Sequence, residues 1–379
     1  MPHKIEQFQS GHWEKGSGYK YFVPTMINEH WEWQSTELNV LLEKASIKLG
    51  ELNTYARRVP NINLFIQLHV TKEAVVSSRI EGTQTEIDEA LLPEEEVDPE
   101  RRDDWNEVNN YIRALNWAIE ELDRIPLSSR LLRNTHQILL QGARGEHKLP
   151  GEFRNSQNWI GGRSLADAVF IPPAHHHLPA LMGDLENFLH NEDIQVPALI
   201  RIGIAHYQFE TIHPFLDGNG RIGRLLITLF LVSEQILIEP LLYLSAFFEE
   251  DRGLYYDNLM NVRKKNDLLQ WLKYFLVGIA QTSEKAANTL SSILDLKNDL
   301  ENRIQTNWGR RIASGLQLLN YLFEHPVIRV RTVEKVCGLS PKAANNLVAS
   351  FVNAGILKET TGQSRNRVFT FELYIKLFE

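Results

Sequence analysis

A stretch near the middle of the chain, HPFLDGNGRIGR at residues 213–224, gathers side chains that bind phosphate and transfer protons. It combines one imidazole, one carboxylate, one carboxamide and two guanidinium groups with three glycines, and the apolar run 225–232 follows directly. Glycines before a helix let backbone N–H groups approach a ligand closely, and the helix N-terminus adds partial positive charge. The stretch therefore predicts a binding site for the phosphates of a nucleotide.

The glycine segment is expected to contact the phosphates through backbone N–H groups, and the two arginines through their side chains. Gly218, Asn219 and Gly220 are predicted to form a nest of backbone N–H groups that opens the helix RIGRLLITLFLV. Arg221 and Arg224 are three residues apart, so they share one face of the first helical turn. Because each guanidinium can bind two phosphate oxygens, the pair is suited to a polyphosphate.

Asp217 and His213 complete the predicted chemistry. Asp217 precedes the nest, where its carboxylate can hold a Mg²⁺ ion that bridges two phosphates. His213 lies in a loop before Pro214, where its imidazole can accept a proton from an attacking hydroxyl. The pattern is not a Walker P-loop, because no G-x-x-x-x-G-K-[ST] motif occurs. It is not a Rossmann turn either, because helices rather than a strand precede it. The stretch therefore predicts a Mg²⁺-nucleotide site with its own general base.

Helices must position this stretch, because helical periodicity dominates most of the chain. Amphipathic helices are predicted at WNEVNNYIRALNWAIEEL, LSSRLLRNTHQILLQGA and VPALIRIGIAHYQFETI, and a helix over residues 63–92 is predicted to be interrupted at EGTQTE. In contrast, GEFRNSQNWIGGRSLADAVFIPP holds two short β-like runs around a polar, glycine-rich loop. This segment predicts a β-hairpin in a mainly helical protein.

Composition limits the class of protein. The 379 residues suggest two or three domains, and 43% apolar with 23% charged residues is ordinary for a globular protein. The net charge of −8 argues against a general nucleic-acid or membrane binder, and Glu234 and Glu239 interrupt the most apolar segment. The single cysteine, Cys337, forbids an intramolecular disulfide, and the N-terminus lacks the apolar segment of a signal peptide. We therefore expect a cytoplasmic protein without a membrane partner.

The pattern changes from residue 311 onwards. Three predicted helices, GLQLLNYLFEH, TVEKVCGL and PKAANNLVASFVNAGIL, are followed by a turn-rich hairpin, which predicts a winged helix. This segment carries nine Lys and Arg against five Asp and Glu, opposite in sign to the whole chain. DNA binding is one reading, but a protein contact or dimerisation is favoured. The side chains placed to contact DNA are Lys342, Asn345 and Asn346 on the last helix and Arg365 and Arg367 on the wing.

The motif HPFLDGNGRIGR resembles the signature of the Fic (Fido) family, His-Pro-Phe-x-(Asp/Glu)-Gly-Asn-Gly-Arg-x-x-Arg, at every fixed position. The hairpin NWIGGRSLADAVFIPP is similar to the flap on which this family docks its targets, and the likeness extends over about residues 65–280. The resemblance implies a Fic-type helical core with a β-hairpin flap. It also implies transfer of AMP from ATP to a Tyr, Thr or Ser hydroxyl of a target protein, with loss of pyrophosphate.

The resemblance further implies a role for individual residues. His213 would be the base and Asp217 the Mg²⁺ ligand, while the nest would hold the α- and β-phosphates and the two arginines the β- and γ-phosphates. Tyr256 and Arg263 fall where the family contacts adenosine, although arginine is not a fixed residue there. The predicted nucleotide site comprises Glu81, Asn158, Trp159, Ile160, Gly161, Asp217, Gly218, Asn219, Gly220, Arg221, Ile222, Gly223, Arg224, Tyr256 and Arg263.

A second motif, SSRIEG at residues 77–82, lies near the end of the helix that starts in the sixties. Ser77 and Glu81 are four residues apart and share a face, and Gly82 suits a helix end. By itself the segment is typical of a solvated helix end. Beside the other motif it resembles the family's inhibitory motif, (Ser/Thr)-x-x-x-Glu-(Gly/Asn), of class II. We expect Glu81 to pair with Arg224 and so to compete with the γ-phosphate.

These readings predict four parts of the chain: an N-terminal helical region with the inhibitory helix (1–125), a Fic catalytic core (126–285), a linker helix (286–310) and a winged helix (311–379). The expected partners are ATP and a target protein, and a homodimer is left open. Two alternatives also remain open. The enzyme could remove AMP, in addition or mainly, with Glu81 orienting water, or the chain could be a DNA-binding regulator whose core senses nucleotide.

Overall fold

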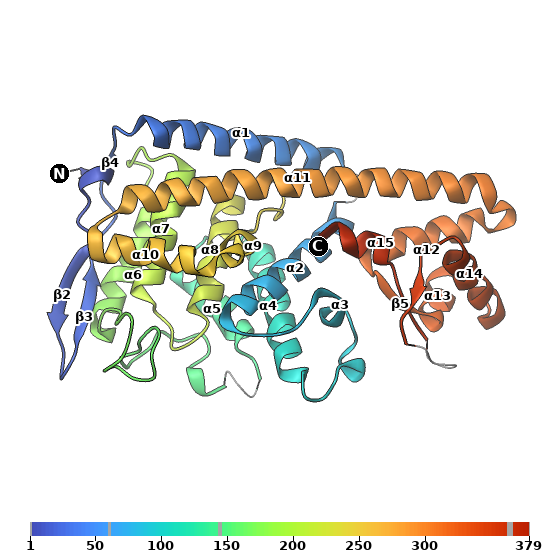
Figure 1. The fold of residues 1–379 in the computed structure, drawn as a ribbon, viewed down its shortest axis with the longest axis horizontal. Coiled ribbons are helices and arrows are strands. Elements are labelled where there is room, and N and C mark those ends of the chain that lie inside the picture. Colours follow the sequence, from blue (N-terminus) through green and yellow to red (C-terminus); the bar gives the residue numbers. More distant parts are fainter. Residues whose placement is uncertain (1, 60–61, 143–145, 362–366, 379) are drawn as a thin grey trace.

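The computed structural model describes residues 2–59, 62–142, 146–361 and 367–378. The expectation of a mainly helical chain is confirmed. The molecule is elongated, with a large helical core at one end and a smaller C-terminal module at the other (Figure 1). Throughout, "C-terminal module" means the described residues from 312 onwards. No helix among the described residues is long and apolar enough to cross a membrane.

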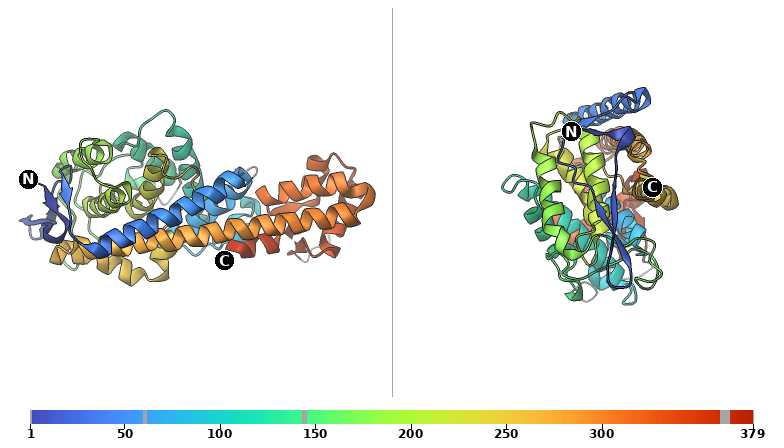
Figure 2. Two further views of the ribbon diagram at one scale, coloured as in Figure 1. Left: turned by 90° about the horizontal axis from the view of Figure 1, so that it is seen from above. Right: turned by 90° about the vertical axis from the view of Figure 1, so that its left-hand side faces the viewer.

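One long helix joins the two ends of the molecule. Helix α11, Leu268–Asn307, begins in the core and runs without a break into the C-terminal module (Figures 1 and 2). Helix α1, Thr36–Arg58, lies along its first part. The predicted boundary at residues 285 and 286 therefore falls inside a continuous helix, whereas α11 ends close to the predicted start of the last part.

The core is built around α7, Ala198–Ile212, which is buried along nearly its whole length. It packs against α8, Asn219–Ser233, and α6, Leu178–His190. Four further helices pack around this centre and bury apolar side chains. They are α2 (Asn63–Glu81), α4 (Arg102–Glu121), α5 (Ser129–Leu139) and α10 (Arg252–Lys265).

The interruption predicted within residues 63–92 is present. Helix α2 ends at Glu81, and Gly82 follows in the left-handed conformation at φ 112°. Short helix α3, Ile87–Ala90, resumes after the break. Glycine suits this position because a side chain would be strained at that φ.

Strands occupy the first part of the chain, where a helical region was expected. Strand β1, His3–Lys4, pairs in parallel with β4, Trp31–Glu32, and β2, Gly11–Lys15, pairs antiparallel with β3, Lys20–Pro24. The apolar run in KYFVP, whose last four residues are buried, is compatible with a strand, but it is too short for its period to decide between a strand and a helix.

The hairpin predicted at residues 158–173 is less regular than expected, and its residues 158–171 are here called the flap. Its two sides meet at a single bridge between Ile160 and Phe170. Gly161 and Gly162 both have positive φ directly after the first side, so the backbone turns away before a longer ladder can form. The flap gains support from outside, because the N–H of Phe22 in β3 donates to the carbonyl of Ile171 at 2.9 Å.

The C-terminal module contains the three helices and the paired strands that were expected. Strands β5, β7 and β6 form an antiparallel sheet in that order. The assignment as a winged helix stays a prediction, and Arg365 lies outside the described residues. The elements are α12 (Ile312–Glu324), β5 (Val327–Arg329), α13 (Val330–Cys337), α14 (Pro341–Asn353), β6 (Lys358–Glu359), β7 (Val368–Thr370), α15 (Glu372–Ile375) and the short 3-10 helix η6 (Lys376–Phe378).

Candidate functional site

The motif loop, residues 213–218, connects the C-terminus of α7 to the N-terminus of α8. His213 adopts the left-handed conformation at φ 51°, and its N–H donates to the carbonyl of Phe209 at 2.9 Å, which ends α7. Gly218 has φ 72° and starts α8. These two reversals bring the imidazole of His213 and the open N–H groups of the first turn of α8 to the same end of the core.

Carboxamide side chains hold the motif loop from inside. The Asn219 carboxamide accepts from the N–H of Phe215 at 2.8 Å and donates to its carbonyl at 2.9 Å. Asn158 of the flap donates to the same carbonyl at 2.9 Å. The side chains of Asn219 and Asn158, both predicted nucleotide contacts, are therefore used to shape the loop, and any contact with phosphate would come from their backbones.

Arg154, which sequence reasoning missed, fastens the end of α7. Its guanidinium donates to the carbonyls of His213 at 2.9 Å and Ile212 at 3.3 Å, and it also binds the carbonyl of Pro173 beyond the flap. The side chain is almost fully buried. No spacing in GEFRNS distinguishes this arginine from a surface residue, so only the fold reveals it.

His136 on α5 is a second residue that the sequence did not indicate. Its Nδ1 accepts from the N–H of Gly151 at 2.9 Å, so Nε2 carries the proton and donates to the carbonyl of Asp217 at 3.0 Å. The ring stacks on Phe215 with centroids 3.8 Å apart. Burial lowers the pKa of His136 to about 4, so the ring is neutral at pH 7 and acts as a rigid support.

The ring of His213 is partly buried and neutral. Burial, together with the positive charges of Arg154 and Arg263, lowers the pKa of His213 to about 3. Its buried Nδ1 has no hydrogen-bond partner among the described residues. An unprotonated imidazole at the mouth of the motif loop is in the state that a general base requires.

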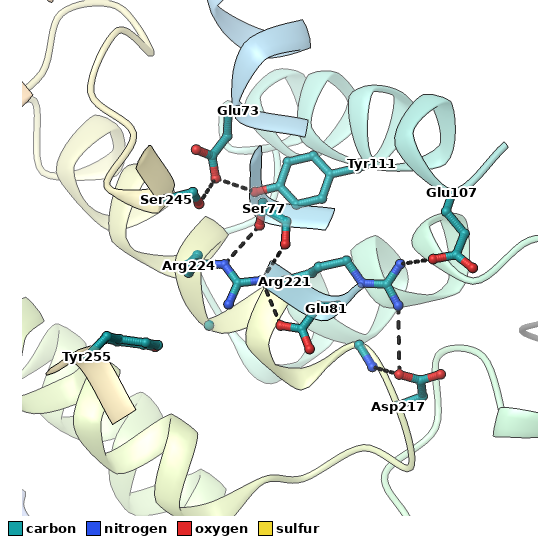
Figure 3. Close-up of polar contacts among 12 residues, drawn as sticks. Glu73, Ser77, Glu81, Glu107, Tyr111, Asp217, Arg221, Arg224, Ser245 and Tyr255 are labelled. Carbon is teal, nitrogen blue, oxygen red and sulfur yellow. Dashed lines mark hydrogen bonds and ion pairs between the residues drawn. The ribbon is translucent and has the colours of Figure 1, made fainter. Parts of the chain in front are cut away.

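Arg224 and Glu81 form the expected ion pair (Figure 3). The guanidinium of Arg224 is 3% exposed, and it donates to Glu81 Oε1 at 2.8 Å, Ser77 Oγ at 2.9 Å and the Ser77 carbonyl at 2.8 Å. Partial burial opposes ionisation of Glu81, but the guanidinium of Arg224 outweighs it and holds the pKa of that carboxyl below its usual value. Glu81 is therefore charged at pH 7.

The carboxylate of Glu81 also lies against the predicted nest. A Cβ on Gly220 would stand 2.3 Å from Glu81 Oε1 and 2.9 Å from a terminal nitrogen of Arg224. Contact this close is tolerated only because residue 220 has no side chain. Glu81 therefore occupies the space beside the first turn of α8 that was predicted to receive a phosphate.

Arg221 is held on the other side of the same turn (Figure 3). Its guanidinium lies 3.4 Å from Glu107 Oε2 on α4 and 3.7 Å from Asp217 Oδ1. The Asp217 side chain is 47% exposed, and its Oδ1 accepts from the N–H of Gly218 at 2.6 Å. Glu107 was not predicted, because it lies more than a hundred residues away in sequence.

Asp217 fits a Mg²⁺ ion that a nucleotide brings with it. The described residues contain no group of three or more His, Cys, Asp or Glu side chains that could hold a metal ion. Mg²⁺ commonly takes only one or two carboxylates from a protein while phosphates and water supply its other oxygens. One exposed carboxylate beside the predicted phosphate site meets this requirement.

The remaining predicted residues of the motif lie inside the protein. Ile222 is buried in the core. Gly223 allows close packing of α7, because a Cβ there would stand 2.2 Å from Glu210 Oε1. Burial raises the pKa of Glu210 to about 7. These residues shape the helix pair, and their side chains offer no direct contact to a phosphate.

Arg263 and Tyr256 both lie on α10, but Arg263 is buried and Tyr256 is exposed. Arg263 is buried, stacks over Phe170 of the flap at 4.1 Å, and donates to the carbonyl of Glu210 at 3.0 Å and the hydroxyl of Thr211 at 3.1 Å. Tyr256 is 40% exposed. Arg263 therefore ties the flap to the end of α7, and its contact with adenosine stays a prediction.

On the flap, Trp159 is 40% exposed and Ile160 pairs with Phe170. Gly161 has φ 67°, and a Cβ there would stand 2.6 Å from Val169.

On the C-terminal module, the side chains of Lys342, Asn345 and Asn346 are exposed on α14, and Arg367 lies 3.4 Å from Asn345.

Two family descriptions match the chain. The one named Fic/DOC family N-terminal matches residues 39–120, and the one named Fic/DOC family matches residues 126–231. A probable protein adenylyltransferase of Aquifex aeolicus is 30% identical over 199 residues, which cover 50% of this chain and 57% of that protein. Protein adenylyltransferase Fic of Drosophila erecta is 30% identical over 227 residues, which cover 57% of this chain and 41% of that protein. The matches thus span about half the length of these curated relatives.

Solved structures show the same fold. A Fic family protein from Desulfovibrio desulfuricans superimposes with a TM-score of 0.56 at 20% identity, covering 89% of this chain and 96% of that one. A Fic domain containing signaling protein from Bacteroides thetaiotaomicron superimposes with a TM-score of 0.50 at 19% identity, covering 68% of this chain and 97% of that one. The matched domains, the complete signature and the shared fold show that this chain belongs to the Fic/DOC family.

Proposed function

We propose that this protein is an adenylyltransferase that transfers AMP from ATP to a Tyr, Thr or Ser hydroxyl of target proteins and of itself, and that Glu81 restrains it. The observation that supports this best is that the motif loop joins a neutral His213 to the open first turn of α8, the helix that carries the buried Arg224. A proton acceptor next to a polyphosphate site suits attack of a hydroxyl on a phosphate, whereas a nucleotide sensor needs no base.

The proposed reaction is a displacement at the α-phosphorus. The target hydroxyl oxygen bonds to that phosphorus, its proton moves to His213, and the bond to the bridging oxygen of the β-phosphate breaks so that pyrophosphate leaves. The N–H groups of α8 and the guanidinium groups of Arg221 and Arg224 offset the charge that develops on the oxygens. Asp217 would hold Mg²⁺, which supplies further charge neutralisation when bound. Phosphates close to His213 would raise the pKa of its imidazole towards the working pH.

The proposed restraint follows from competition for Arg224. Its guanidinium already donates to Glu81 and to Ser77, so a γ-phosphate cannot take the same positions. ATP would then bind with its α-phosphate out of line with the attacking hydroxyl. Displacement of about 1 Å can cost ~10²-fold in rate, so restraint does not require exclusion of ATP.

Incubation with Mg²⁺ and α-labelled ATP, followed by mass spectrometry for AMP-bearing peptides, tests the proposed activity. In a Glu81→Gly background, His213→Ala should lower transfer by ~10²–10⁴-fold and leave ATP affinity nearly unchanged, because the imidazole acts on the hydroxyl. EDTA or Asp217→Ala should also lower transfer strongly. Normal labelling by the His213→Ala variant would contradict the assignment. Loss of AMP from pre-labelled protein only when Glu81 is present would favour the AMP-removing alternative.

We further propose that a target segment docks on the flap and that the C-terminal module contacts a protein rather than DNA. A DNA contact through Lys342 on α14 and Arg367 would release counterions, so affinity would fall steeply as salt concentration rises. Binding measured between low and physiological salt, with Lys342→Ala as the matched variant, separates the two readings. A flat salt response is expected for a protein partner, and a steep response that Lys342→Ala reduces would establish DNA binding.

A further inference from the structure

Arg224 is held by two residues of α2, and only one of them is Glu81 (Figure 3). Its Nε donates to Ser77 Oγ at 2.9 Å, and its Nη2 donates both to the Ser77 carbonyl at 2.8 Å and to Glu81 Oε1 at 2.8 Å. The other terminal nitrogen, Nη1, lies beside Gly220 in the first turn of α8, where a Cβ would stand 2.9 Å from it. Each nitrogen of the guanidinium therefore has a defined neighbour.

The contacts with Ser77 do not depend on Glu81. Ser77 is fully buried, whereas the Glu81 side chain is 36% exposed and reaches Arg224 through one nitrogen. If Glu81 leaves, the two bonds to Ser77 still fix Nε and Nη2. Because a guanidinium is planar, two fixed nitrogens also fix the direction of the third. Nη1 then stays beside α8, and the N–H of Nη2 that Glu81 has left becomes available to a phosphate oxygen.

Buried hydrogen bonds fix the orientation of α2 next to Ser77 (Figure 3). Glu73 lies one turn before Ser77 on the same face of the helix. Its Oε1 accepts from the hydroxyl of Tyr111 on α4 at 2.9 Å and from the hydroxyl of Ser245 at 2.5 Å, at the start of α9 (Ser245–Glu250). All four side chains are buried. The helix therefore cannot rotate Ser77 outwards without breaking these bonds to two neighbouring helices.

The next residue in the chain shows that burial by itself does not bring a serine to Arg224. Ser78 is as fully buried as Ser77, but its hydroxyl makes no hydrogen bond among the described residues. Neighbouring residues of a helix point in directions about 100° apart, so the two serines lie on different faces of α2. Ser78→Ala removes a buried hydroxyl of the same helix without altering a contact of Arg224, which makes it a matched control.

We propose that Ser77 is a positioning residue that directs Arg224 at the γ-phosphate, although it lies in the same segment as the restraining Glu81. The phosphate would replace Glu81 at Nη2 and also bind Nη1, while both bonds to Ser77 stay in place. Helix α2 thus carries two side chains with opposite effects, because Ser77 orients the arginine and Glu81 withholds it. The inference rests on the proposed function, which assigns the γ-phosphate to Arg224.

Paired measurements of ATP and ADP affinity test this role without relying on catalysis. The background is the full chain with Glu81→Gly and His213→Ala, in which the arginine is released and the proposed reaction is blocked. Calorimetry with Mg²⁺ should show that ATP binds more tightly than ADP. Ser77→Ala should weaken ATP binding about tenfold, the loss typical of one hydrogen bond to a charged group, and leave ADP, which has no γ-phosphate, nearly unchanged. Arg224→Ala should remove the whole preference, and Ser78→Ala should leave it intact.

Two further measurements separate this role from a loss of folding. Circular dichroism compares the variants, and Ser77→Cys repeats the affinity test with a side chain of similar size whose sulfur is only a weak acceptor. In the Glu81→Gly chain that retains His213, Ser77→Ala should raise KM for ATP about tenfold. A rise in AMP transfer instead would show that Ser77 belongs to the restraint, and it would overturn the inference.

The affinity data distinguish failure of the inference from failure of the proposed function. If Ser77→Ala and Ser77→Cys keep the full preference for ATP while Arg224→Ala loses it, the inference is wrong and the assignment of Arg224 to the γ-phosphate stands. If Ser78→Ala weakens ATP binding as much as Ser77→Ala, the effect is a general disturbance of α2, and the inference is again wrong. If the background chain binds ADP as tightly as ATP, the phosphate assignment fails and the inference fails with it.

Discussion

The motif loop and the flap touch each other but are held in opposite ways. In the motif loop, buried side chains satisfy the backbone: Asn219 and Asn158 bind Phe215, while Arg154 binds the end of α7. The flap closes on itself at one bridge and relies on β3 for support, and Val169 within it is 59% exposed. The motif loop is thus held rigidly, whereas the flap has few contacts of its own, which suits the proposed docking of a target segment.

Glu81 is held less firmly than the motif loop and more firmly than the flap. It meets the rigid region through one ion pair at the end of α2, and Gly82 directly afterwards releases the chain from the helix. The pair can therefore be broken without disturbing the loop. If Glu81 restrains the site as proposed, this contact is more easily lost than the hydrogen bonds that hold the motif loop.

Among changes that test this comparison, the largest effect is expected from removing the internal support of the motif loop. Asn219→Ala leaves the buried N–H of Phe215 without its acceptor, while Asn158 still donates to the Phe215 carbonyl. The variant should lower the free energy of unfolding by about 1–3 kcal/mol and transfer by ~10²-fold. Thermal unfolding and labelled-ATP assays measure both effects. Asn302→Ala, on the exposed face of α11, is the matched control. Unchanged Tm and transfer in Asn219→Ala would show that the loop is not held as the hydrogen bonds suggest.

A smaller effect of opposite sign is expected at Glu81. Glu81→Gly should raise AMP transfer and self-modification about tenfold or more, because Arg224 becomes available to the γ-phosphate. Arg224→Ala should abolish this gain in the double variant, since the arginine itself serves the phosphate. Glu95→Gly, at an exposed position, should have no effect. If Glu81→Gly were no more active than the parent, the SSRIEG segment would be an ordinary helix end.

The same ion pair predicts the pH dependence of restraint. The pKa of Glu81 lies below its usual value, so the pair is complete above the ordinary glutamate pKa and is lost as pH falls through the lowered one. The ratio of Glu81→Gly activity to parent activity should therefore be flat between about pH 6 and 8. A ratio that changes steeply in this window would point to another titrating group.

The smallest effect is expected in the flap. Gly161→Val places a β-branched residue at positive φ against Val169, a strain of about 1–2 kcal/mol that should raise KM for a protein target about tenfold. ATP affinity and kcat should change little, because the motif loop is untouched. Steady-state kinetics with a protein target separate the two constants. A fall in kcat as large as that of His213→Ala would mean that the flap is part of the rigid site.

The sequence by itself determined those features of the site that depend on contacts between residues close together in the chain. Asn219 binds Phe215 four residues away, Arg221 and Arg224 are placed by helical spacing, and Gly82 ends α2 through its own backbone. Such hydrogen bonds and turns depend on neighbouring residues, so their pattern is readable from a short stretch. For the same reason, the mainly helical fold and the interruption after Glu81 could be predicted.

Only the tertiary structure decided which distant residues complete the site. Arg154, His136 and Glu107 contact the motif loop or Arg221 across 59, 81 and 114 residues. The support of the flap by β3 was equally invisible in the sequence. Contacts of this kind depend on how the helices pack around α7, and packing depends on the shape of many side chains together rather than on any local period.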